Sequence, residues 1–296
     1  MDKTYYNNAS EEEKKFLDKY SPGDWKRPAV TADIVVFTVN PVGMLCVVLI
    51  QRKGYPYKGA WALPGGFLRV DEESVGETAV RELKEETGLS GVFLQQLKTY
   101  SEPERDPRMH VISVAHFALV PYSKISIVAG DDASDVDLFE ISKLLVPLKQ
   151  MNSELGHSIQ FLGDIFQFVP LSYGINLEAS LEEKVVKGVS RYCTVAAVKE
   201  EDLAFDHFRV IKDAIQRLQG RKDYCEDLFD LLEDKNSFTV SDYKKIYDAV
   251  SFEKSDNANF RKMFKNRYVK TGVVEMLNKK TVRGAELYTF VGRSYV

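Results

Sequence analysis

Cysteine and histidine are scarce in this chain of 296 residues, which contains three Cys and four His. The cysteines, Cys46, Cys193 and Cys225, do not share the short spacing of a pair of metal ligands. The histidines are scattered along the chain, so a structural zinc site is not expected. We expect the three thiols to be reduced and mostly buried, as in a cytoplasmic protein.

Long apolar runs are absent as well. No stretch is apolar over the roughly 20 residues that a membrane-spanning helix needs. The N-terminal stretch MDKTYYNNASEEEKK has no apolar core of the kind found in a secretory signal. We therefore expect a cytoplasmic location and no membrane partner.

Charge is plentiful but unevenly distributed around a net charge of −4. From Ser255 onward the chain has nine Lys or Arg against three Asp or Glu, so this region is basic and the remainder is acidic. A basic region on an acidic body indicates an anionic partner for that region. The length suits two domains, and we predict them at residues 1–200 and 201–296.

The most informative stretch is Gly65–Leu89, which reads GGFLRVDEESVGETAVRELKEETGL. Ser74 and Glu77 have the spacing of a capping box, and Gly88 stands where a helix is expected to end. The positions that recur every four residues, and would face a core, are Val75, Ala79 and Leu83. The pattern predicts a helix that follows a double-glycine turn.

Three carboxylates of this helix, Glu82, Glu85 and Glu86, fall within about one third of its circumference. They repel one another unless a cation lies among them, and carboxylate oxygens are ligands of Mg²⁺ or Mn²⁺. Arg81 is one turn before Glu85 and could pair with it. A solvated amphipathic helix is the alternative, but two glycines ahead of the helix allow the backbone to approach a ligand closely.

Together, Pro64-Gly65-Gly66, Glu73, Arg81-Glu82 and the run from Glu85 to Gly88 resemble the Nudix box, a loop–helix motif that binds a divalent metal and a diphosphate. Gly66 and Glu73 enclose six residues, one more than is usual in the family, whereas the spacing from Glu73 to Leu89 fits. Choosing Glu72 instead would put the extra residue in the helix. We choose Glu73 because a loop accommodates an insertion more easily than a helix.

This resemblance implies roles for individual residues. The implied catalytic set is Glu73, Arg81, Glu82, Glu85 and Glu86. The implied ligands of Mg²⁺ or Mn²⁺ are Glu82, Glu85, Glu86 and the Gly65 carbonyl, with Arg81 orienting the carboxylates and pairing with Glu73. The general base stays open between Glu104 and Asp131, and for each of them loop capping is the favoured alternative.

Alternating apolar patterns predict a hairpin of Val30–Val39 and Met44–Gln51, with a turn at residues 40–43. Further strands are predicted at Val92–Thr99, Val111–Val120 and Val136–Ile141, and a short helix from Ser10 to about Tyr20. A mixed sheet with helices on both sides follows, an α/β class that agrees with the α/β/α sandwich of the Nudix family. Residues 146–198 depart from the family and predict a strand-rich insertion, either a dimer contact or a lid.

The segments YPYKGAWALPGGF, ERDPRMHVISVAHFALV and AGDDASDVDLFEI resemble the Nudix branch that acts on ADP-ribose, together with relatives that regulate transcription in bacterial NAD or sugar metabolism. The candidate substrate-binding residues are Arg52, Gly65, Gly66, Arg105 and Arg108. The guanidinium groups are candidates because they offer forked donors to phosphate or ribose. For Arg105, pairing with Asp106 or Glu104 is an equal alternative.

The C-terminal region reads as helices followed by a hairpin. Helices are predicted at Leu203–Leu218, Asp223–Leu232 and Val240–Val250, with a fourth, capped by Asp256 or Asn257, that ends near Arg267. Phe260, Met263 and Phe264 form the predicted inward stripe of the fourth helix. Two strands follow, at Gly272–Leu277 and Glu286–Val291.

This order is typical of a winged helix-turn-helix domain, and the pieces LAFDH, DNANFRK and VRGAELYTF resemble the C-terminal domain of the Nudix-related regulators. The candidate DNA-binding residues are Asn259, Arg261, Lys262, Lys265, Lys279, Lys280 and Arg283. The alternative is a domain that only dimerises, with solvated lysines.

The sequence thus predicts a homodimeric, ligand-responsive transcriptional regulator that binds duplex DNA. Its Nudix domain is predicted to bind and hydrolyse ADP-ribose or a related nucleoside diphosphate compound. One alternative is a non-catalytic sensor of a nucleotide or sugar phosphate. The other is a plain Nudix pyrophosphatase whose C-terminal domain only dimerises.

Overall fold

The computed structural model describes residues 10–19, 26–129, 133–145, 149–152, 158–171, 177–186, 192–194, 203–275 and 285–290. Within these residues no helix combines the length and the apolar character needed to cross a bilayer. The predicted base Asp131 and the DNA-binding candidates Lys279, Lys280 and Arg283 lie outside the described residues.

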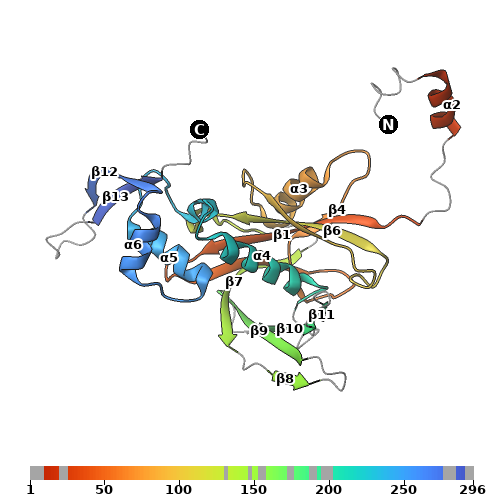
Figure 1. Ribbon diagram of the computed structural model, residues 1–296. Helices are drawn as coiled ribbons and strands as arrows, with labels where there is room; N and C mark the ends of the chain where they lie inside the picture. Colours follow the sequence, from red (N-terminus) through yellow and green to blue (C-terminus); the bar gives the residue numbers. More distant parts are fainter. Residues whose placement is uncertain are drawn as a thin grey trace.

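A mixed sheet forms the centre of the molecule (Figure 1). Its strands follow the order β11-β10-β9-β7-β2-β1-β6-β5, and the short strands β3, β4 and β8 pair with β2, β1 and β9. The central strands are β1 (Ala29–Val39), β2 (Leu45–Arg52), β3 (Trp61–Ala62), β4 (Gly65–Phe67), β5 (Gln95–Tyr100), β6 (Val111–Leu119) and β7 (Ala133–Leu145). β1 runs parallel to β6 and antiparallel to β2, so the sheet is mixed, as predicted.

The alternation of side chains along β1 divides the interior into two cores. Ile34 and Val36 face one side with Ala79 and Leu83 of helix α3 (Val75–Thr87). Val35 and its odd-numbered neighbours face the other side, with helix α4 (His207–Arg221). Successive residues of a strand point to opposite faces, so one apolar strand serves both cores. The predicted α/β class with a helix on each face is confirmed (Figure 1).

Several predicted elements occur with shifted ends. Helix α2 (Glu11–Lys19) begins after Ser10, whose side chain and that of Glu13 form a capping box. The predicted hairpin is present, and Asn40 closes its turn by accepting the Met44 N–H at 2.9 Å. Strand β5 begins at Gln95 rather than Val92, and β7 extends well beyond the predicted Val136–Ile141.

The insertion is strand-rich, as predicted. It contributes β8 (Lys149–Asn152), β9 (Ser158–Pro170), β10 (Leu177–Val186) and β11 (Tyr192–Thr194), which extend the sheet beyond β7. Phe166 and Phe168 of β9 pack against Phe208 of α4, with ring centroids 6.0 and 6.1 Å apart. The insertion therefore contributes to the main core. Whether it forms a lid or a dimer contact stays a prediction.

The C-terminal region has the predicted helix-turn-helix and hairpin. It comprises the 3₁₀ helix η2 (Asp227–Leu231), α5 (Val240–Ser251), α6 (Asn257–Phe264), β12 (Tyr268–Glu275) and β13 (Ala285–Phe290). The predicted helix Asp223–Leu232 was wrong, because only a short 3₁₀ segment forms there. Asp256, rather than Asn257, caps α6 by accepting the N–H groups of Ala258 and Asn259.

The inward stripe of α6 is narrower than predicted. Phe260 and Phe264 are buried against the rings of Tyr243 and Tyr247, whereas Met263 is 48% exposed. An eight-residue helix has a core on one side only, so the position at the edge of its stripe stays in solvent.

A single apolar cluster runs from one face of the sheet through α4 and η2 to α5 and α6. The core is therefore continuous across residue 200. The division of the chain into domains at that position stays a prediction.

Candidate functional site

Helix α3 is fixed at both ends as the sequence predicted. Ser74 and Glu77 form a reciprocal capping box, and Gly88 ends the helix in the left-handed region at φ 75°. The loop before the helix contains Asp71, also left-handed at φ 66°. That conformation lets the loop turn tightly and absorb its extra residue ahead of the helix.

Arg81 is the hub of the acidic cluster. Its guanidinium donates to both carboxylate oxygens of Glu73, at 2.9 and 2.6 Å, and also to Glu82 at 2.5 Å and Glu85 at 2.9 Å. The hydrogen bond from Arg81 lowers the pKa of Glu73 to about 2. The carboxylates thus surround one cation, and the choice of Glu73 over the exposed Glu72 agrees with this geometry.

The double glycine brings backbone against two of these carboxylates. The Gly65 N–H donates to Glu86 at 2.7 Å, and a Cβ on Gly66 would overlap the Glu82 carboxylate. A Cβ on Gly65 would overlap the Ala32 carbonyl oxygen of the neighbouring strand. At Gly65 only glycine allows the loop to lie this close to β1, whereas a side chain at Gly66 would have to displace the Glu82 carboxylate.

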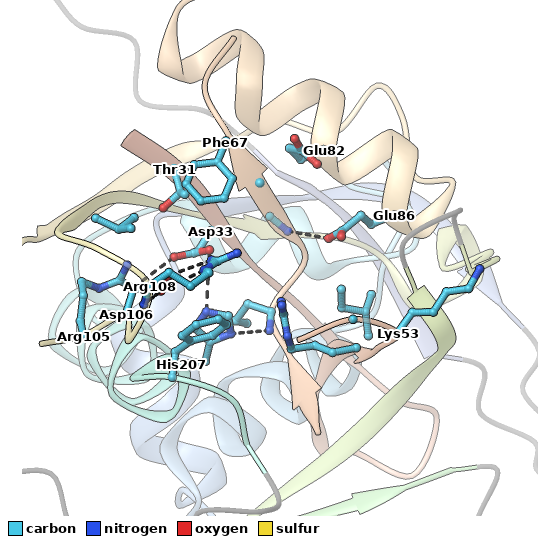
Figure 2. Close-up of a pocket in the computed structure, with 18 residues that line it drawn as sticks. Thr31, Asp33, Lys53, Phe67, Glu82, Glu86, Arg105, Asp106, Arg108 and His207 are labelled. Atoms are coloured by element: carbon cyan, nitrogen blue, oxygen red, sulfur yellow. Dashed lines mark hydrogen bonds and ion pairs between the residues drawn. The ribbon is translucent and has the colours of Figure 1, made fainter. Parts of the chain in front are cut away.

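A cleft of about 400 Å³ opens beside the loop. Glu82 and Glu86 project into it from α3, and Arg105, Arg108 and His207 lie opposite (Figure 2). All five predicted substrate-binding residues line this cleft: Arg52, Gly65, Gly66, Arg105 and Arg108. Glu73, Arg81, Glu85 and the candidate base Glu104 do not. The structure brings the candidates together, while their roles stay predictions.

The two glutamates that line the cleft, Glu82 and Glu86, are shielded from solvent to different degrees. Glu86 is 8% exposed. Burial raises the pKa of Glu82, and the hydrogen bond and charge of Arg81 oppose this rise. Glu85 is half exposed and pairs with Arg69 and Arg81 outside the cleft.

The arginines of the cleft differ in their partners. Arg105 donates two hydrogen bonds to Asp206, at 3.1 and 2.6 Å, and one to Asp33 at 3.4 Å. Arg105 thus pairs with carboxylates other than Asp106 and Glu104, the two partners that the alternative interpretation named. It is Arg108 that pairs with Asp106, through two bonds of 3.0 and 2.7 Å. The sequence could not show this, because Asp206 is 101 residues from Arg105.

Arg52 is held differently. Its Nε donates to the Pro56 carbonyl at 2.9 Å, and its guanidinium lies 4.9 Å from the centroid of the Phe205 ring. In the described part of the chain no carboxylate forms an ion pair with it. Burial and the charge of Arg108 lower the pKa of Arg52. An anion bound beside Arg52 would offset both effects and favour its charged form.

Sequence reasoning missed a segment of the cleft that follows the insertion. Phe205, Asp206 and His207 all contact cleft residues, and Asp33 lines the same cleft. The Leu63 N–H donates to Nδ1 of His207 at 2.8 Å, and burial lowers the pKa of this histidine. The available signal was the motif LAFDH, which we assigned only to the C-terminal domain.

The donor set can be tested for a divalent cation. Among the described residues no three or more Cys, His, Asp or Glu form a preassembled metal cluster. Mg²⁺ commonly binds through one or two carboxylates, with substrate phosphates and waters completing its shell. Glu82 and Glu86 offer such a pair of hard oxygen donors at the cleft, so the residues present fit Mg²⁺ or Mn²⁺.

The second candidate surface lies on α6. Asn259, Arg261, Lys262 and Lys265 are all exposed. Arg267, by contrast, donates to main-chain carbonyls of Cys225 and Asp223 and so has a structural partner. The α6 side chains are available to an anionic ligand, and their contact with DNA stays a prediction.

Comparisons with known proteins match the first part of the chain to one family and nearly the whole chain to several relatives. A family model described as NUDIX domain matches residues 27–162. An ADP-ribose pyrophosphatase from Methanocaldococcus jannaschii is 41% identical over 131 residues, which cover 44% of this chain and 72% of the relative. The chain belongs to the Nudix family.

Among Nudix relatives, the ADPR responsive transcriptional repressor NtrR of Acinetobacter baylyi is 26% identical over 287 residues, covering 96% of this chain and 90% of the relative. The crystal structure of a MutT/nudix family protein from Enterococcus faecalis is 25% identical, with a TM-score of 0.67 over 97% of this chain and 96% of that one. Shewanella oneidensis NrtR, crystallised with a 27mer DNA, is 23% identical and shares the fold, with a TM-score of 0.56 over 88% and 93%.

Proposed function

We propose that this protein is a ligand-responsive transcriptional regulator whose Nudix cleft binds and hydrolyses ADP-ribose or a related nucleoside diphosphate compound. One observation carries the proposal: two carboxylates of α3 face three arginines and the Phe67 and Phe205 rings across one cleft. The carboxylates suit a divalent cation, the guanidiniums a diphosphate, and the rings a planar base. The names of the two curated relatives, both of which refer to ADP-ribose, support the choice of ligand.

In the proposed reaction the oxygen of a water molecule bonds to one phosphorus and the bridging P–O bond breaks, which gives two monophosphates. When bound at Glu82 and Glu86, Mg²⁺ or Mn²⁺ supplies charge neutralisation and a more acidic water. Arg52, Arg105 and Arg108 would bind the phosphate or ribose oxygens. Arg81 would hold Glu82 in place through its 2.5 Å hydrogen bond.

The C-terminal part, proposed as residues 201–296, would bind duplex DNA as part of a homodimer. Helix α6 is the second helix of the helix-turn-helix, and in this arrangement the second helix enters the major groove. The exposed side chains of Arg261, Lys262 and the C-cap residue Lys265 carry three positive charges, and they support this assignment. Binding of the nucleotide and of DNA would be reciprocally coupled, because each ligand must change the affinity for the other by the same factor.

Hydrolysis is tested with the purified protein, Mg²⁺ and ADP-ribose, with release of AMP as the readout. Glu82→Gln and Glu86→Gln are each expected to lower kcat/KM by about tenfold or more, since each removes a charged ligand in the cleft. Glu72→Gln serves as the control, because this exposed neighbour does not line the cleft. Binding of ADP-ribose by calorimetry without AMP release would favour the non-catalytic sensor.

DNA binding is tested with duplex DNA from the protein's own promoter region at several salt concentrations. We expect affinity to fall with salt, and Arg261→Ala or Lys262→Ala to reduce the slope by about one counterion each. Lys84→Ala removes an exposed positive charge from α3 and is the matched control. Absent or salt-independent binding would favour the plain pyrophosphatase whose C-terminal domain only dimerises.

A further inference from the structure

Two residues of the segment Leu203–His207, Phe205 and His207, line the cleft although the segment follows the insertion. Leu203 forms a parallel bridge with Trp61, and the Ala204 N–H donates to the Trp61 carbonyl at 2.8 Å. The side chains of Leu203 and Trp61 are both buried. The segment therefore lies along strand β3, directly before the double glycine.

His207, the last residue of this segment, acts on that loop through one hydrogen bond. The Leu63 N–H donates to Nδ1 of His207 at 2.8 Å, and both groups are buried. Two residues later, the Gly65 N–H donates to Glu86 at 2.7 Å. Because Nδ1 accepts, the ring proton of a neutral imidazole is on Nε2, which lies 3.8 Å from Asp33.

The two residues before His207 contact other parts of the cleft. Asp206 holds the Arg105 guanidinium through two hydrogen bonds. Phe205 has a φ of 55°, which a residue other than glycine rarely adopts, and its ring lies against Arg52 and Arg108. Such strain persists where the surroundings enforce it. Three consecutive residues thus each contact a different part of the cleft lining: Asp206 binds Arg105, Phe205 lies against Arg52 and Arg108, and His207 binds Leu63.

We propose that His207 is a positioning residue of the Nudix site. By accepting the Leu63 N–H it fixes the connection between β3 and β4 that leads into Gly65, and through Gly65 the carboxylate of Glu86. The site is incomplete without this residue from beyond the insertion. His207 is also the first residue of α4, so the geometry of the loop is tied directly to the helix that packs between the sheet and α5. This inference rests on the proposed function for its ligand, ADP-ribose.

The test compares two variants of the full chain. His207→Phe keeps an aromatic ring but removes the acceptor, which leaves a buried N–H unpaired. His207→Asn keeps an acceptor near the position of Nδ1. We expect the first variant to bind ADP-ribose with Mg²⁺ at least about tenfold more weakly, and the second to stay within about threefold of the wild type. His110→Phe is the control, because His110 is exposed and does not line the cleft.

A second measurement reads the protonation of the His207 ring directly in the wild-type protein, and a variant serves only to assign its signal. With selective ¹⁵N labelling of the four histidines, the signal lost in His207→Asn identifies the ring of His207. We expect the pattern of an imidazole with a proton on Nε2 and none on Nδ1. A protonated Nδ1, or equal loss of affinity in the Phe and Asn variants with the fold intact, overturns the proposal. If the wild type binds no ADP-ribose, the proposed function fails. The ring spectrum then decides by itself whether Nδ1 of His207 accepts the Leu63 N–H.

Discussion

Residue scale: the two glycines of the loop face different obstacles. A Cβ on Gly65 would meet backbone of β1, whereas the atoms nearest to a Cβ on Gly66 belong to the end of the Glu82 side chain. Backbone cannot move aside without breaking the pairing of β4 with β1, but a side chain can rotate. The first glycine thus serves the fold and the second serves the position of a carboxylate.

We therefore expect alanine to lower stability at Gly65 and to lower activity at Gly66. Gly65→Ala should lower the free energy of unfolding by about 1 to 3 kcal/mol through overpacking. Gly66→Ala should leave stability nearly unchanged but displace Glu82 and lower AMP release by about tenfold. Urea denaturation and the hydrolysis assay, applied to both variants, separate the two. Equal losses of stability would contradict the assignment.

Glu73 supplies a prediction about pH. Its pKa is about 2 in the folded protein and near 4.5 in an unfolded chain, so the unfolded state binds more protons between these values. The stabilisation by the Glu73–Arg81 pair is complete above pH 4.5 and is lost as pH falls toward 2. The difference in unfolding free energy between the wild type and Glu73→Gln should therefore shrink over that range. Denaturation at a series of pH values measures it, with Glu72→Gln as the exposed control. A constant difference would refute the pairing.

Element scale: helices and strands with strong local signals were predictable. α3 has an apolar stripe, a capping box and a terminal glycine, and each signal acts within a few residues of chain. β1 and β2 are buried along nearly their full length and follow one another through a short turn. The stretch from Asp223 lacked such signals, and tertiary packing left it with one 3₁₀ segment.

The capping box of α3 gives a test at this scale. Ser74→Ala should destabilise the protein by about 1 kcal/mol, because the Glu77 N–H loses its acceptor at the start of the helix. Ser74→Thr keeps a hydroxyl and should retain most of the stability. Thermal unfolding of the three proteins measures the difference. If the alanine variant were as stable as the wild type, the cap would have no role in stability.

Whole-molecule scale: the two halves share one core. Phe166 of the insertion packs on Phe208 of α4 and on Phe252 after α5, at 6.0 and 5.9 Å. At the opposite edge of the sheet, Tyr100 and Lys98 of β5 both donate to Asp213 of α4. Contacts of this kind favour cooperative unfolding of both halves.

We expect a single unfolding transition, even for a lesion in the C-terminal part. Phe260→Ala should cost about 3 to 5 kcal/mol by opening a cavity beneath α6. With Trp25 replaced by Phe, Trp61 is the remaining tryptophan and reports on the sheet. Its fluorescence and far-UV circular dichroism should shift together in urea. A sheet signal unaffected by Phe260→Ala would instead support independent domains divided near residue 200.

The sequence by itself determined the local features of this protein: the loop and helix of the acidic cluster, the Arg81–Glu85 pair, the helix caps and the strands of the hairpin. Each depends on residues close together in the chain, where spacing alone decides which side chains can meet. Only the tertiary structure decided the partner of Arg105 and the place of His207 beneath the loop. Those contacts join residues more than 100 positions apart, and a periodic pattern carries no information about which distant segments fold together.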